Sequence, residues 1–280
     1  MSQPPQQPAD KPKMIGVTLF LERPAEIDYP LLMDRTGSVL GLDPQQAAGL
    51  KPDGPMLFFI DGDMIAGANM DAPYPDPIDH PAAFAYWWPD AKKDIARHKA
   101  HFMVFCSWSK FSRLDAHMRH LALVRELVEQ LPVIGVLWGS ALVPTAIFKG
   151  EFANAQKGGF PFSLWVLIQY SKQPNGNFLI STLGMRGFGQ MEIETESSLP
   201  IDQTFDLVRK FGSYILASGR AVKDGDTFGY SEEQRIKVRY VRSFRPDVNG
   251  NVYWLELSEN PSVKRPTGFF SNLFGSKKKH

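Results

Sequence analysis

AFAYWWPDAKKDIARHKAHFMVFCSW, residues 83–108, is the stretch that decides the fold. Its second part, residues 101–108, is the most apolar strand pattern of the chain. Side chains alternate along a strand, so the two faces take Phe102, Val104 and Cys106 on one side, and His101, Met103, Phe105 and Ser107 on the other. Both faces are largely apolar, which predicts an interior strand covered by helices on at least one side.

An aromatic amphipathic helix is predicted just before this strand, over residues 81–96. Its apolar residues recur at spacings of three and four, the stripe of a helix packed on a sheet. Pro89 falls inside the pattern and should kink or split the helix near Trp88. Two adjacent tryptophans cannot point the same way from a helix, so either Trp87 or Trp88 lines a surface or groove, or both belong to the core.

Working outward, the first hundred residues give the order strand, helix, strand, strand, helix, strand. The elements before the central stretch are a strand at 14–21, a short helix at 27–34 and two strands at 56–60 and 64–70. Asp-Gly between the last two predicts a hairpin. This order is that of the ferredoxin-like unit.

The order repeats after the clearest helix of the chain, residues 112–131. Residues 133–138 predict a strand, 141–149 a short helix, 163–170 and 177–183 a hairpin, 190–195 an exposed strand, and 201–218 a second strong helix; two closing strands are at 235–244 and 251–258. We therefore expect an α+β protein of two tandem ferredoxin-like (βαββαβ) halves with mostly antiparallel sheets. A doubly wound parallel sheet is disfavoured, because three hairpins are antiparallel signals.

The predicted organisation has five parts. A disordered leader, rich in Pro and Gln, covers residues 1–13. The first α+β half covers 14–110, the bridging helix 111–132 and the second half 133–260, and an aromatic and basic tail covers 261–280.

Composition excludes several classes of protein. The 280 residues carry a net charge of +1, which disfavours a dedicated nucleic-acid binder. Cys106 is the one cysteine, so no internal disulfide is possible, and a thiol on a buried strand is expected to be inert. No signal-peptide pattern and no run of the ~18 apolar residues that span a bilayer is present, so we expect a cytoplasmic protein.

Short pieces of this sequence resemble a bacterial family known as domain of unknown function 4261. They are MIGVTLF at 14–20, APYP at 72–75, Trp88-Pro89, HKAH at 98–101, GVLWG at 135–139, LWV at 164–166, TLGMRGFGQMEIE at 182–194 and DGDT at 224–227. The resemblance spans about residues 14–243 and implies no activity. Because some proteins of this kind look like neighbours of secretion or toxin systems, it implies a protein-binding role.

Candidate catalytic residues are few and scattered along the chain. His98 and His101, with the carboxylates Glu192, Glu194 and Asp226, could face a cleft between the two halves. The alternative for Asp226, in an Asp-Gly-Asp sequence, is turn chemistry. The alternative for the two glutamates is a solvated sheet edge.

Metal and phosphate sites are weakly indicated. His117 and His120 share one face of the 112–131 helix and could reach one ion, or be partly buried histidines beside an apolar face. Since zinc sites need three or four ligands, we expect no metal and no cofactor. The glycines at 184, 187 and 189 superficially offer a phosphate loop, but no helix follows directly and a bulged hairpin is favoured.

Rigid aromatic segments give the leading interpretation, a non-catalytic protein-binding module with an immunity-like or secretion-accessory role. The predicted binding residues are Pro73, Tyr74, Pro75, Trp87 and Trp88, followed in the tail by Phe269, Phe270, Leu273 and Phe274. Large rigid side chains of this kind anchor interfaces. The tail could dock in a partner groove, weakly touch an anionic membrane surface, or fold back on the domain. An enzyme or small-ligand binder using the cleft between the halves is the alternative.

Overall fold

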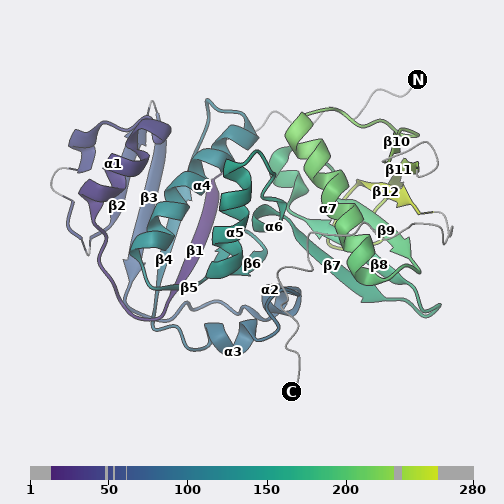
Figure 1. The fold of residues 1–280 in the computed structure, drawn as a ribbon, viewed down its shortest axis with the longest axis horizontal. Coiled ribbons are helices and arrows are strands. Elements are labelled where there is room, and N and C mark those ends of the chain that lie inside the picture. The colour runs from purple at the N-terminus through teal and green to yellow at the C-terminus, as the bar shows by residue number, and fades with distance from the viewer. Residues whose placement is uncertain (1–13, 48–49, 53, 61, 230–234, 258–280) are drawn as a thin grey trace, which may run out of the picture.

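The computed structural model describes residues 14–47, 50–52, 54–60, 62–229 and 235–257. The predicted leader and tail lie outside these residues. The described chain forms an α+β fold with two six-stranded sheets side by side (Figure 1). Its elements through the first sheet are β1 (Ile15–Leu21), α1 (Tyr29–Leu40), η1 (Pro44–Ala47), β2 (Met56–Ile60), β3 (Asp63–Met70), α2 (Asp79–Ala83), α3 (Ala91–Ile95), β4 (Ala100–Cys106), α4 (Arg113–Gln130), β5 (Val133–Trp138) and β6 (Ala141–Pro144).

The first sheet is antiparallel throughout, in the order β2-β3-β4-β1-β5-β6. As predicted, β4 is an interior strand, paired with β3 on one side and β1 on the other. Its Phe102, Val104 and Cys106 are fully buried. Figure 1 shows α1, α4 and α5 (Thr145–Gln156) lying together across this inner face of the sheet.

The predicted kink at Pro89 is a full break. Two short helices, α2 and α3, replace one long helix, and residues 84–90 connect them. Trp88 is buried against the opposite face of the sheet, where its ring lies on Gly135 so closely that a Cβ there would be 2.7 Å from it. This segment covers only one end of that face, over Phe20 and Leu142.

The second sheet is mixed, in the order β10-β11-β12-β9-β8-β7. This sheet follows α6 (Phe162–Trp165). Its strands are β7 (Leu167–Lys172), β8 (Phe178–Leu183), β9 (Ile193–Ser197), β10 (Thr227–Phe228), β11 (Ile236–Arg242) and β12 (Asn251–Glu256). The helix η2 (Met185–Phe188) lies between β8 and β9 in the chain, and α7 (Ile201–Ser218) follows β9. The β12–β9 pair is parallel and the other pairs are antiparallel. Helix α7 has the predicted bounds and ends at Gly219, whose φ of 61° suits a left-handed cap.

The α+β class and the mostly antiparallel pairing are confirmed, but ferredoxin-like halves are not shown. Strand β4 lies between β3 and β1, and β5 and β6 extend the first sheet. Residues 133–144 therefore pair in the first sheet, although the sequence placed them in the second half; the domain boundaries stay predictions.

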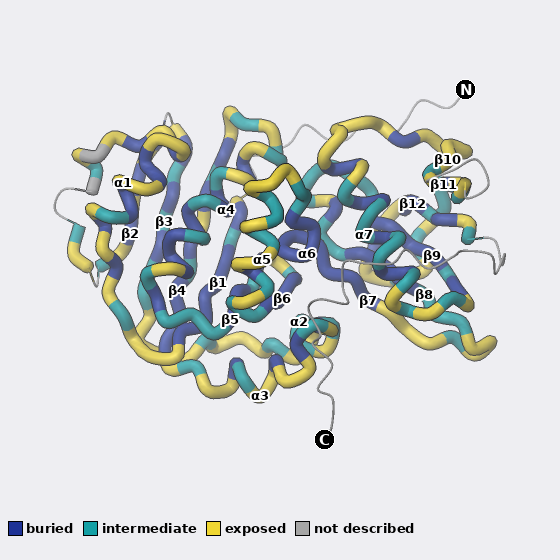
Figure 2. Tube along the Cα trace, in the orientation of Figure 1, coloured by how far each residue is buried: buried dark blue, intermediate teal, exposed yellow. Residues whose placement is uncertain are grey.

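One continuous apolar core contains buried residues of both sheets. Figure 2 shows the buried residues concentrated in the strands and the inner faces of the helices. At the junction, Trp138 of β5 and Trp165 of α6 lie 6.0 Å apart between ring centroids, with His117 of α4 against both. No helix of the described residues has the length and apolar character to cross a membrane.

Candidate protein-binding surface

The face of the first sheet opposite α1, α4 and α5 is only partly covered. Residues paired across antiparallel strands share a face, so the register assigns side chains to it. We call these residues the outer face: Leu57, Phe59, Met64, Ala66, Ala68, Met70, Met103, Phe105, Gly16, Thr18 and Leu137. None of them is charged.

Four large apolar side chains of the outer face are exposed. Phe59 is 60% exposed, Leu57 45%, Met70 42% and Phe105 36%. They come from three neighbouring strands. Leu57 and Phe105 both pair with Ala66, and Met70 lines the same pocket as Phe105, so uncharged residues of the outer face connect them. Exposed apolar patches are candidates for interaction surfaces in folded proteins.

A pocket of about 610 Å³ opens where the outer face meets the loop after β3. Gly16, Thr18, Met103, Phe105 and Leu137 line it from the sheet, and residues 72–76 line it from the loop. The ring of Phe105 lies directly over Gly16, since a Cβ there would be 2.9 Å from the ring. A glycine in β1 thus lets a large ring lie flat at the edge of the pocket.

The predicted binding residues Pro73, Tyr74 and Pro75 all line this pocket. The two candidate catalytic histidines hold their loop in place. The backbone N–H of Tyr74 donates to Nε2 of His98 over 2.6 Å, and Nδ1 of His101 bonds the carbonyl of Ala72 over 2.7 Å.

Contacts between aromatic rings also hold this loop against the sheet. The ring of Tyr74 meets Phe20 edge-on at 5.6 Å and His101 at 5.4 Å. Proline restricts the backbone on both sides of Tyr74. The loop is therefore a preorganised wall, which lowers the entropy lost when a ligand docks against it.

Three polar groups line the pocket, from Thr18, Tyr74 and Asp76. Burial raises the pKa of the Tyr74 phenol, and hydrogen bonding with Asp76 raises it further. The hydroxyl of Thr18 is also within reach of the phenol. The pocket is thus apolar at its floor, with an exposed carboxylate, Asp76, beside it. That combination suits an apolar side chain followed by a cationic group.

The two tryptophans take different positions. Trp88 belongs to the small core over Phe20, and its Nε1 donates to Asp94 over 2.8 Å. Trp87 is half-buried against the main core, beside Tyr86, whose ring meets Phe205 of α7 at 4.9 Å. Neither lines the pocket described above.

The candidate carboxylates lie in or just before strands of the second sheet, whereas His98 and His101 lie just before and in β4 of the first. The prediction of a solvated edge for Glu192 and Glu194 was wrong, because β9 lies between β8 and β12 and both side chains are buried. The strand alternates polar and apolar residues, but its polar face is covered by residues 243–245.

Glu192 is a structural brace. Its carboxylate accepts hydrogen bonds from the Thr182 hydroxyl at 2.7 Å and from the backbone N–H groups of Gly184, Met185 and Arg186 at 3.1–3.3 Å. Burial raises its pKa, while these bonds oppose that shift. The N–H groups that a phosphate loop would present are taken by Glu192, which argues against a phosphate site there. The glycine-rich loop instead contains η2 and connects the antiparallel strands β8 and β9.

Glu194 and Asp226 have local partners as well. Glu194 accepts bonds from the Ser243 hydroxyl and from the backbone N–H of Phe244 at 3.0 Å. Asp226 accepts from the backbone N–H of Lys223 at 2.8 Å, closing the turn at Gly225, which has a φ of 90°. Sequence reasoning missed Arg245, which bonds Ser181 at 3.3 Å and pairs with Asp247 over this part of the sheet.

The histidines of α4 face the core. Nδ1 of His117 bonds the carbonyl of Arg113 at 2.7 Å, and Nδ1 of His120 lies 2.7 Å from the Cys106 sulfur. Burial lowers the pKa of both imidazoles and raises that of the Cys106 thiol well above its usual value. Within the described ranges, no three His, Cys, Asp or Glu side chains are grouped so that they could hold a metal ion.

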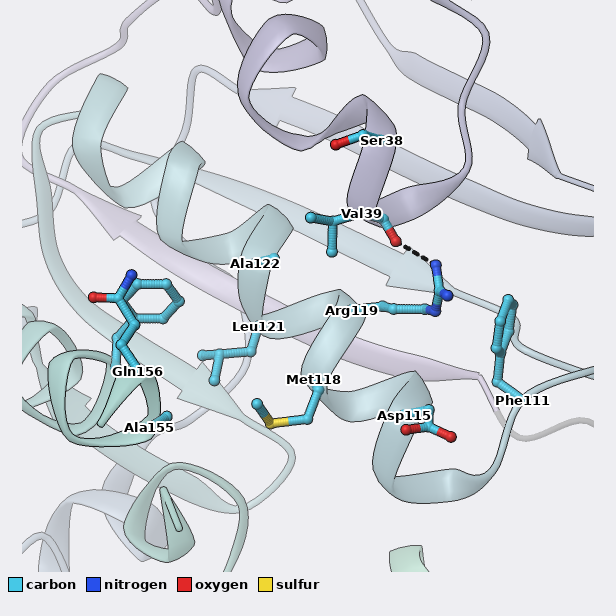
Figure 3. A pocket seen from close by; sticks show the side chains of 11 residues that line it. Ser38, Val39, Phe111, Asp115, Met118, Arg119, Leu121, Ala122, Ala155 and Gln156 are labelled. Atoms are coloured by element: carbon cyan, nitrogen blue, oxygen red, sulfur yellow. Dashed lines mark hydrogen bonds between the residues drawn. The ribbon is translucent and has the colours of Figure 1, made fainter. Parts of the chain in front are cut away.

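A second hollow, of about 700 Å³, lies on the helical side between α1, α4 and α5 (Figure 3). Met118, Leu121 and Ala122 of α4 line it beside Val39 of α1. The Arg119 guanidinium lies 4.0 Å from the centroid of the Phe111 ring and donates to the Val39 carbonyl. This is the groove expected between packed helices, and an arginine occupies one end of it.

Comparison with known proteins identifies one part of the chain. Residues 181–253 match the family model described as Domain of unknown function (DUF4261), so the chain carries this domain over β8 to β12. The matched segment is shorter than the resemblance over residues 14–243 suggested, and the outer face lies outside it. No curated protein and no solved structure is matched.

Proposed function

We propose that this protein is a non-catalytic protein-binding module whose outer face receives an apolar segment of a partner. The observation that carries the proposal is the contiguous uncharged surface formed by Leu57, Phe59, Met70 and Phe105. Such a surface is costly to leave in water, and a partner that covers it gains the transfer free energy. The immunity-like or secretion-accessory role expected from the family resemblance stays a prediction.

The pocket indicates which chemical groups a partner should present. Full burial of one large apolar side chain contributes about 1.5–3 kcal/mol, so four that are about half exposed offer on the order of 3–6 kcal/mol. Association costs at least about 4 kcal/mol, so the flat surface alone binds weakly. A partner must also fill the pocket beside Tyr74, and a positive charge next to Asp76 complements its rim.

The test is capture of a partner from native lysate with the tagged full-length protein and two variants. Phe105→Lys puts a charge on the outer face, and its matched control Phe244→Lys changes a ring that is 65% exposed on the segment after β11. We expect a stoichiometric partner with the wild type and the control. Loss of a central anchor costs about 2 kcal/mol, or roughly 30-fold in affinity, so Phe105→Lys should lose the partner.

Two results would contradict the proposal. One is a partner retained equally by Phe105→Lys and by the control. The other is repeated recovery of no stoichiometric partner with the intact wild-type chain. Circular dichroism and thermal unfolding of each variant show whether it is still folded, so that loss of the binding surface can be told from unfolding. Phe59→Lys, on the edge strand β2, is the milder second variant, because Phe59 is the most exposed ring of the outer face.

A further inference from the structure

We propose that the aromatic and basic tail of this same chain occupies the outer face when no partner is bound. The tail, residues 264–280, reads KRPTGFFSNLFGSKKKH and lies outside the described residues. The proposal rests on the proposed function only in assigning the tail and a partner to one surface. Docking of the tail itself is tested separately below.

Apolar complementarity is the first argument. The tail contains Phe269, Phe270, Leu273 and Phe274, three aromatic rings and a leucine within six residues. Large apolar side chains of this kind are the usual anchors of an interface. The outer face offers four exposed apolar side chains from three adjacent strands and a pocket of about 610 Å³ that can take a ring.

Charge is the second argument. The tail is basic, with Lys264 and Arg265 before its rings and three lysines after them. The loop beside the outer face presents the exposed acids Asp71 and Asp76, and Asp76 lines the pocket.

The tail is tethered to the second sheet. The described chain ends just after β12, and eleven residues, 258–268, precede the first tail ring. Extended, they span up to about 40 Å. A tethered segment acts at an effective concentration in the millimolar range, so weak intrinsic affinity is enough for docking within the chain.

The experiment is photo-crosslinking in the full chain. A benzophenone amino acid replaces Phe270, the protein is irradiated at low concentration, and cross-linked peptides are identified by mass spectrometry. We expect intrachain cross-links to β3, to β4 and to the loop at residues 71–76. In the same chain, Phe59→Lys or Phe105→Lys should lower the cross-linked fraction at least fivefold, and Phe244→Lys should leave it unchanged.

Four outcomes overturn the proposal. They are cross-links to α1, α4 or α5, cross-links between two chains, cross-links that persist in both outer-face variants, and none above the level of a probe placed at Gln3. The partner capture is then repeated with a protein that lacks residues 261–280 and compared with the full-length protein. If the tail cross-links as expected but neither the full-length nor the shortened protein captures a partner, the proposed function fails and the docking of the tail stands.

Discussion

Lowering the pH should destabilise this protein through two buried histidines, well above the range in which carboxylates titrate. His117 and His120 lie on α4 at the junction of the two sheets, packed on Trp138, and His117 also contacts Trp165 and Phe188. Burial lowers the pKa of His117 to about 4 and that of His120 to about 3. In an unfolded chain, a histidine titrates near pH 6.5.

The sign and size follow from proton linkage. Between pH 6.5 and 5, both imidazoles stay neutral in the folded chain, whereas the unfolded chain takes up a proton at each. The stability that they contribute is therefore fully present above pH 6.5 and is lost as the pH falls. One pKa unit is worth 1.36 kcal/mol, so a fall of 1.5 pH units removes about 2 kcal/mol for each histidine.

About 4 kcal/mol in total is a large share of the 5–15 kcal/mol that stabilises a typical domain. Other groups change the absolute value. Burial raises the pKa of Glu151 and of Glu192. These two carboxyls therefore stabilise the folded state as the pH falls, which opposes the loss of stability from the histidines. A variant that removes one imidazole isolates its contribution from that background.

The assay is urea unfolding followed by tryptophan fluorescence at pH 7.5 and 5.0. We expect the wild type to lose several kcal/mol between these values, and His117→Phe to lose about 2 kcal/mol less. Phenylalanine keeps an aromatic ring against Phe188 and does not titrate. His80→Gln, which changes an exposed histidine on α2, is the control for loss of an imidazole. Equal pH dependence in wild type and His117→Phe would refute the reasoning.

Three further predictions concern packing and chemistry. Glu192→Gln places an amide donor against the N–H groups at 184–186 and should cost about 2 kcal/mol; hydrogen exchange at these amides should rise, and unchanged protection would argue against the brace. Gly135→Ala puts a Cβ 2.7 Å from the Trp88 ring and should cost about 1–3 kcal/mol in denaturant unfolding, so an unchanged midpoint would contradict this contact. Cys106, fully buried with a raised pKa, should not react with a thiol reagent until the chain unfolds; rapid labelling of the native protein would show otherwise.

Local patterns predicted most elements because their causes are local. The hydroxyl of Ser112 caps α4 by accepting from the backbone N–H of Asp115, and Gly219 ends α7 in the left-handed region. The break at Pro89 also follows from one residue. Pro73, Tyr74 and Pro75, which line the pocket, were predicted as a binding segment because two prolines make the backbone there rigid.

The carboxylates and histidines show what a linear pattern misses. Glu194 looked solvated, yet its partners are Ser243 and Phe244, about fifty residues away. His98 and His101 were candidate catalytic residues, yet both form hydrogen bonds to the backbone of the loop that starts at Ala72. Burial of a polar group depends on donors brought by other elements, so no spacing rule within one strand reveals it.

The sequence by itself determined most of the helices and strands, and it placed apolar residues on both faces of β4. Only the tertiary structure decided which of those faces stays exposed to solvent. Helices α1, α4 and α5 cover the inner face, while α2 and α3 reach only the end over Phe20 and leave Phe105 exposed. The physical reason is that periodicity fixes the direction of a side chain, whereas its covering depends on contacts between distant segments.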